Sequence, residues 1–157
     1  MEHFGMTLEE NKTRLIEFGR YAGKRNGKKP ETFTFLGFTH YCSKSRNGKF
    51  RVKRKTSRRK FAKKCKEISK LIQDMRKEPL RDKIKKLNQV LVGYYHYYGI
   101  TDNSRSLSSF RVRVMQSLYK CLNRRSQNRS YSWAGFNEML KAYPLANPRI
   151  YVNVYGG

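Results

Sequence analysis

The sequence is poor in acidic residues. It contains 11 Asp and Glu against 36 Lys and Arg, which gives a formal net charge of +25 at pH 7. Only three of the acids are aspartates, and they stand apart at Asp74, Asp82 and Asp102. Two-metal phosphoryl chemistry needs carboxylates that converge on one point. The sequence therefore predicts no metal site, no cofactor and no catalysis by this chain alone.

Cysteine pairs and long hydrophobic runs are also missing. The three cysteines, Cys42, Cys65 and Cys121, form no CxxC pair, so neither a disulfide framework nor a zinc site is predicted. No run approaches the roughly 18 apolar residues of a membrane-spanning helix. Acids also stand near the start, where a signal peptide carries positive charge and an apolar core. We expect a cytoplasmic protein that does not bind membranes.

The positive charge is concentrated in residues 44–70. This segment holds 14 Lys and Arg and a single acid, Glu67, so 13 of the 25 net charges lie within 27 residues. Clustered basic charge of this kind is typical of a surface that contacts nucleic-acid phosphates. The alternative is a solvated charged face, but such a face would normally carry balancing acids.

The hydrophobic pattern predicts an α+β fold, with a small antiparallel sheet followed by three or four helices. Residues 32–41 are rich in aromatic and β-branched residues and are predicted to form one strand. A shorter strand-like run is expected at 12–18. Asn47-Gly48 predicts a hairpin with a type I′ turn, and a strand with one apolar and one cationic face follows from Phe50.

Apolar residues spaced three and four apart predict the helices. The first begins at Thr56 or Ser57, either of which can cap it. The second covers 80–98 and starts after a helix-breaking proline. The third covers about 104–121, with Thr101, Asp102 or Ser104 as its cap, and a shorter helix follows Ser132. The tail from Pro144 has no clear pattern.

Three groups of residues are candidates for RNA binding. Cations in the first turn of the first helix oppose its dipole, and such a local conflict indicates a site where free N–H groups would anchor a phosphate. In GYYHYYG (93–99), Tyr95 and His96 are expected to face outward and contact bases, phosphates or 2′-hydroxyls, unless the cluster packs the helices together. Arginines of the third helix contact either the same nucleic acid or none. The candidates are Lys49, Arg51, Lys53, Arg54, Lys55, Arg58, Arg59, Lys60, Lys63, Lys64, Tyr95, His96, Arg105, Arg111, Arg124 and Arg125.

Three blocks resemble the C-terminal part of bacterial group II intron-encoded reverse transcriptase/maturases. In order they read KTRLIEFGR, FTFLGFTHYCSKSRNGKFRVKRKTSRRK and LNQVLVGYYHYYGI, and the resemblance covers about residues 8–148. It implies a palm-end and primer-grip-like β segment at 8–56, a thumb-like basic helix at 57–78, a maturase-specific helical region (domain X-like) at 79–148 and a tail at 149–157. The palm-end residue is Lys12, and the primer-grip-like residues are Phe35, Leu36, Gly37 and Phe38.

The family's metal-binding aspartates lie upstream of this part and have no counterpart in these residues. The resemblance therefore implies an RNA-binding module that assists intron splicing and has structured intron RNA as its partner. One alternative is the thumb subunit of a split reverse transcriptase, which would complement an upstream core and bind an RNA/DNA duplex. A general basic RNA-binding protein is the other.

Overall fold

The computed structural model describes residues 16–23, 27–124 and 131–155. Lys12 and Arg125 lie outside these ranges, and residues 16–18 of the predicted strand-like run form no strand. The observed elements confirm the α+β class. They are β1 (Phe33–Phe35), β2 (Phe38–Lys44), β3 (Phe50–Thr56), α1 (Arg58–Asp74), α2 (Leu80–Tyr98), α3 (Ser104–Asn123) and α4 (Trp133–Ala142).

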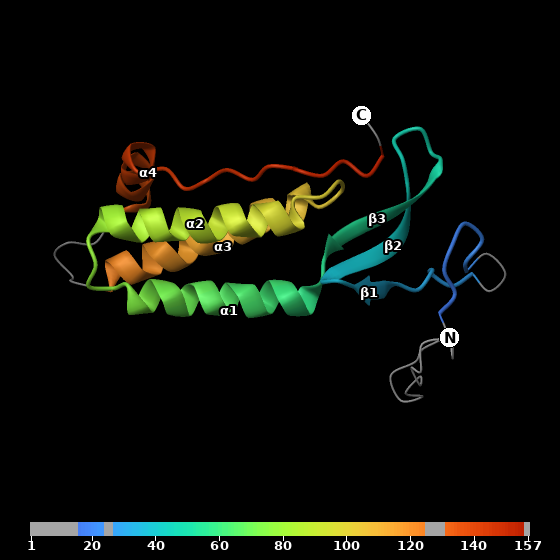
Figure 1. The fold of residues 1–157 in the computed structure, drawn as a ribbon, viewed down its shortest axis with the longest axis horizontal. Coiled ribbons are helices and arrows are strands. Elements are labelled where there is room, and N and C mark those ends of the chain that lie inside the picture. Colours follow the sequence, from blue (N-terminus) through green and yellow to red (C-terminus); the bar gives the residue numbers. More distant parts are fainter. Residues whose placement is uncertain (1–15, 24–26, 125–130, 156–157) are drawn as a thin grey trace, which may run out of the picture.

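The sheet stands at one end of a helical bundle (Figure 1). Its strands pair antiparallel in the order β1-β2-β3. Helices α1 and α3 run away from the sheet, α2 runs back toward it, and α4 lies at the far end. The segment after α4 then returns along α2 toward the sheet. Val152 forms a bridge with Ile100, just after α2, and Tyr155 Oη donates to the Val52 carbonyl of β3. This tail, which had no predicted structure, therefore joins the bundle to the sheet.

The core lies between the helices, on the stripes that the spacing predicts. On the predicted stripe of α3, the side chains from Leu107 to Leu118 are completely buried, and the stripes of α1 and α2 are buried through most of each helix. At least 16 hydrophobic side chains form this cluster, and burial of each contributes on the order of 1.5–3 kcal/mol. Representative members are Ile68, Ile72, Leu87, Leu91, Leu107, Phe110, Val114, Leu118 and Phe136.

The single strand predicted over 32–41 is wrong, because a tight turn at Leu36-Gly37 divides it. Phe35 pairs with Phe38, and the two residues between them have φ values of 52° and 83°. A two-residue hairpin loop requires this left-handed backbone. Leucine rarely adopts it, so the sequence carries no ordinary turn signal here. The turn is fixed from outside, since Tyr97 Oη donates to the Leu36 carbonyl at 2.9 Å.

The hairpin predicted between β2 and β3 is confirmed, but its turn type is wrong. Ser45 N donates to the Lys49 carbonyl at 2.8 Å, which leaves a three-residue loop. In the described part of the chain, Leu36 and Asp102 are the non-glycine residues with positive φ, so Asn47 is not left-handed as a type I′ turn requires. Gly48, with φ of 77°, supplies the single left-handed residue that closes a three-residue hairpin loop.

Asn103 joins the sheet to the bundle. Its side chain is 1% exposed; Oδ1 accepts from Thr56 N, and Nδ2 donates to Thr56 Oγ1 and to the Tyr98 carbonyl, at 2.8–2.9 Å. Asn103 is also the N-cap position of α3, although its side chain caps no helical N–H. The prediction that Thr101, Asp102 or Ser104 caps α3 is wrong, because no side chain among the described residues caps this helix. The Thr101 hydroxyl donates to the Val152 carbonyl and Asp102 accepts from Tyr155, so both bind the tail instead.

Candidate nucleic-acid interface

Ten cations follow one another along the chain from the β2–β3 loop through β3 into the start of α1. Strand β3 ends at Thr56 and α1 begins at Arg58, so the strand passes directly into the helix. Thr56 and Ser57, at this junction, are buried. None of the ten cations is buried. Among the described residues, only one of them has a carboxylate partner, at 3.6 Å in the pair Lys64–Glu67. We define the basic surface as Lys49, Arg51, Lys53, Arg54, Lys55, Arg58, Arg59, Lys60, Lys63 and Lys64.

The N-terminus of α1 lies within the basic surface. Ser57 is the N-cap: its Oγ accepts from Lys60 N at 3.3 Å, and its own N–H donates to the Gly37 carbonyl at 2.8 Å. No acid stands in the first turn. The N–H groups of Arg58 and Arg59 remain available, as the first donors of any helix are. Helix dipole, free donors and side-chain charge thus favour an anion at the same place.

Two arginines of β3 lie against neighbouring side chains. The guanidinium of Arg51 lies 3.6 Å from the centre of the Tyr155 ring, and Tyr155 Oη donates to the Val52 carbonyl at 2.8 Å. Arg54 lies beside His40, whose pKa is lowered by burial and then by the charge of Arg54. Lys55 Nζ lies 5.2 Å from the centre of the Tyr41 ring. The exposed cations in the first turn of α1, Arg58, Arg59 and Lys60, are better placed to meet a ligand.

A groove of about 790 Å³ separates the start of α1 from the end of α2 and borders the basic surface. The β1–β2 turn closes one end, and Tyr97, which is 57% exposed, supplies an aromatic ring. At Gly93 an added Cβ would meet no atom within 4 Å. Glycine in the middle of α2 therefore serves no internal contact. We call this the α1–α2 groove; its lining includes Leu36, Lys60, Lys64, Val90, Gly93 and Tyr97.

The prediction that Tyr95 faces outward is wrong. Its side chain is 1% exposed, and its Oη donates to the Ala146 carbonyl at 2.9 Å. Burial raises the pKa of this phenol to about 12. His96 is exposed, with its ring stacked on Tyr151 at 4.0 Å. Tyr97, the residue after His96, has an exposed aromatic ring and was not among the predicted RNA-binding residues.

The arginines of α3 do not form one surface. Arg111 is half-buried and donates to the Leu145 carbonyl at 3.5 Å, so it fixes the tail. Arg105 is exposed in the first turn of α3, whereas Arg124 follows its last turn. A helix of 20 residues is about 30 Å long. These two arginines therefore cannot contact the same phosphate.

The primer-grip-like residues occupy the β1–β2 turn. Phe35 and Leu36 are exposed there. Gly37 and Phe38 are half-buried against α2, and the Phe38 ring lies 5.3 Å from that of Tyr98. The turn thus presents two apolar side chains outward beside the α1–α2 groove.

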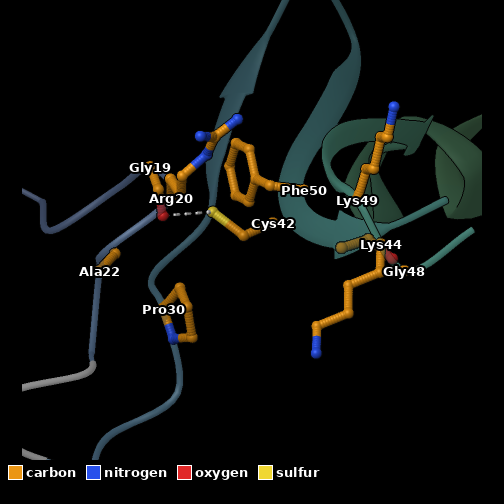
Figure 2. Close-up of a pocket in the computed structure, with 10 residues that line it drawn as sticks. Gly19, Arg20, Ala22, Pro30, Cys42, Lys44, Gly48, Lys49 and Phe50 are labelled. Atoms are coloured by element: carbon orange, nitrogen blue, oxygen red, sulfur yellow. Dashed lines mark hydrogen bonds between the residues drawn. The ribbon is translucent and has the colours of Figure 1, made fainter.

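A second hollow, of about 840 Å³, lies between the segment before β1 and the β2–β3 hairpin (Figure 2). The Cys42 thiol donates to the Gly19 carbonyl at 3.6 Å on its wall. Lys44 and Lys49 also line it, but Figure 2 shows their side chains extending in opposite directions. Because the cations diverge, this hollow is a weaker phosphate site than the basic surface.

The described residues also bear on metals and membranes. They contain no group of three or more His, Cys, Asp or Glu side chains that could hold a metal ion. In the same part of the chain, no helix has the length and apolar character needed to cross a bilayer.

Comparison with known protein families gives a match over half of the chain. The family model of the group II intron maturase-specific domain matches residues 58–137, which is 80 of the 157 residues. The match begins with the first residue of α1 and extends into α4. No curated protein and no solved structure matches the chain.

Proposed function

Because the chain belongs to the group II intron maturase-specific domain family, we propose that it is an RNA-binding module that assists splicing by holding intron RNA on its basic surface. The family assigns the process and implies intron RNA as the partner. In this proposal the β segment resembles a palm end with its primer grip, α1 a thumb helix, and residues 79–148 domain X. The RNA lies across β3 and the start of α1.

One observation carries this proposal: the described carboxylates leave the charge of the basic surface almost entirely without ion-pair partners. In the part of the chain that the structure describes, one of the ten cations, Lys64, forms an ion pair, and the other nine form none. Mutual repulsion of such charges is unfavourable in the free protein. RNA phosphates would relieve it and would release counterions from the RNA. The aromatic wall of the α1–α2 groove adds a surface on which bases can stack.

The test is RNA affinity as a function of salt. Each neutralised phosphate contributes about −0.9 to the log–log slope for a duplex and about −0.7 for a single strand. We expect a slope of several units with intron RNA. A slope near zero would contradict the proposal. A general basic RNA-binding protein would bind unrelated structured RNA equally well, so the same titration with such an RNA tests the intron preference.

A charge-matched pair of variants locates the site. In the first, Arg58, Arg59 and Lys60 are replaced by glutamine. This change removes cations from a first turn that disfavours them, so the fold should be unharmed while RNA affinity and the salt slope decrease. In the control, Lys77, Arg81 and Lys85, exposed at the opposite end of the bundle, become glutamine. Equal losses in both variants would argue against a localised site.

A second function, support of a separately encoded polymerase core, is favoured by the exposed β1–β2 turn. Phe35 and Leu36 lie side by side in solvent, and adjacent exposed apolar side chains are typical of a contact with another protein surface. Primer extension by an upstream reverse transcriptase core, with and without this chain, tests it. Extension that this chain does not change would exclude that role.

A further inference from the structure

A second basic site lies between α1 and α3, at the end of the bundle away from the sheet. The two helices enclose a cleft of about 430 Å³. Beside Ile72 and Cys121, its lining contains polar and cationic side chains from both helices: Ser69, Gln73 and Arg76 from α1 and the residues after it, and Ser117, Lys120 and Arg124 from α3 and its C-cap.

The spacing of these residues brings their charges together. Ser69 Oγ and Ser117 Oγ are hydrogen-bonded at 3.0 Å, which fixes the register of two helices that run in the same direction (Figure 1). Arg76 and Arg124 each stand seven residues beyond their serine. For Arg124 this is about two turns of α3, whereas Arg76 lies just past the end of α1. Both arginines line the cleft, Arg76 from the α1 side and Arg124 from the α3 side.

The cations of this cleft form no ion pair within the part of the chain that the structure describes. Arg76, Lys120 and Arg124 are exposed, and none of them forms an ion pair with a described carboxylate. The half-buried serine hydroxyls form the floor. Hydroxyls beneath two guanidinium groups and an ammonium are the donors that a phosphate accepts.

The helix dipole does not account for this cluster. Cations near a helix C-terminus are favourable by about 0.3–1 kcal/mol, which could explain Lys120 and Arg124. The last turn of α1, however, contains no cation, and Arg76 lies beyond its C-cap. The dipole also gives no reason for a polar cleft between the helices. A ligand that meets all three charges explains both features.

We propose that this cleft binds a backbone phosphate of RNA, as a contact separate from the basic surface. The proposal rests on the proposed function, because it takes the ligand to be the same RNA. Arg58 and Arg76 are separated by about 25 Å along the α1 direction. An RNA that occupies both sites must therefore span the length of the bundle.

The experiment compares three proteins in the same salt titration with intron RNA. The cleft variant carries Arg76→Gln, Lys120→Gln and Arg124→Gln, and the control carries Lys77→Gln, Arg81→Gln and Lys85→Gln at the same end of the bundle. Loss of charge-assisted hydrogen bonds should weaken RNA binding by the cleft variant roughly tenfold or more. The log–log salt slope should become shallower by the contribution of one phosphate contact, about 0.7–0.9. The control should retain nearly the affinity of the unchanged protein.

A second measurement uses the unchanged protein and does not depend on how the variants fold. Acetylation of Lys120 is followed by mass spectrometry, with exposed Lys85 as the internal reference. RNA should protect Lys120 but not Lys85, and inorganic phosphate alone should protect it much less.

The outcomes separate the two proposals. RNA binding with a steep slope, combined with equal behaviour of the cleft and control variants and no protection of Lys120, would overturn the cleft and leave the proposed function intact. Equal protection by inorganic phosphate would assign the cleft to a free anion and overturn its RNA role. Failure of the unchanged protein to bind RNA would overturn both proposals.

Discussion

Replacement of Gly93 by alanine should stabilise the protein and weaken its binding to RNA. Gly93 lies inside α2, where alanine is favoured over glycine by about 0.8–1 kcal/mol. A methyl group there meets no atom within 4 Å, so no clash reduces the gain. The free energy of unfolding should rise by about 1 kcal/mol. For a domain of this size, that corresponds to an increase in Tm of roughly 2–4 °C.

The effect on RNA binding should have the opposite sign. Gly93 contributes to the floor of the α1–α2 groove between Val90 and Tyr97, so a new methyl group would hold a closely packed ligand away. Overpacking costs about 1–3 kcal/mol in protein cores. A value near 1.4 kcal/mol at this more open site corresponds to about a tenfold loss of affinity.

Thermal denaturation and RNA titration of the same protein preparation test both effects of Gly93→Ala. Val92→Ala is the matched control, because it also improves helix propensity but adds no atom and lies outside the groove lining. Higher stability with unchanged affinity would show that RNA does not occupy the groove. Lower stability would show that the space beside Gly93 is not open. The steric explanation of weaker RNA binding would then fail as well.

Three further predictions concern the fold. Asn103→Ala leaves the buried Thr56 N–H and the Tyr98 carbonyl without their partner, so urea denaturation should show a loss of about 2–5 kcal/mol; a loss below about 1 kcal/mol would contradict it. Gly37→Ala forces alanine into φ of +83° with its Cβ 3.2 Å from Tyr98 Oη, and should cost at least about 1–2 kcal/mol in the same assay; unchanged stability would contradict the turn geometry. Burial raises the pKa of Tyr95 to about 12 from 10.0, so between these values the folded state keeps a proton that the unfolded state loses. The free energy of unfolding should therefore decrease as pH rises from about 10 toward 12. Tyr95→Phe should reduce this decrease, and an identical pH profile in the variant would exclude Tyr95 as its cause.

The helices could be predicted from the sequence because their signals are local. Apolar residues at three- and four-residue intervals mark the face that a helix buries, and a proline or serine marks its start. The stripes through Ile72, Leu91 and Val114 are buried as their spacing predicts. Ser57 caps α1 for the same local reason, since its Oγ reaches the N–H three residues ahead.

The features that could not be predicted depend on contacts distant in sequence. The turn at Leu36 is held by Tyr97, which lies 61 residues away. Tyr95 is buried because the tail lies along α2, and Ala146 of that tail accepts its hydroxyl. The spacing placed Tyr94 on the buried stripe, but it could not show that a second side of α2 is covered as well. A tail without periodicity gave no signal for that second partner.

The predicted RNA-binding residues of the candidate interface differ in whether their side chains are tied into the fold. Arg111 and Tyr95 are tied to the tail, so their substitution would change the fold and could not report on RNA alone. The cations at the start of α1 lie outside the buried cluster, and their removal relieves an unfavourable dipole contact. A loss of RNA binding in such variants can therefore be assigned to the missing charge. This separation of the core from the charged surface makes the proposed function testable one site at a time.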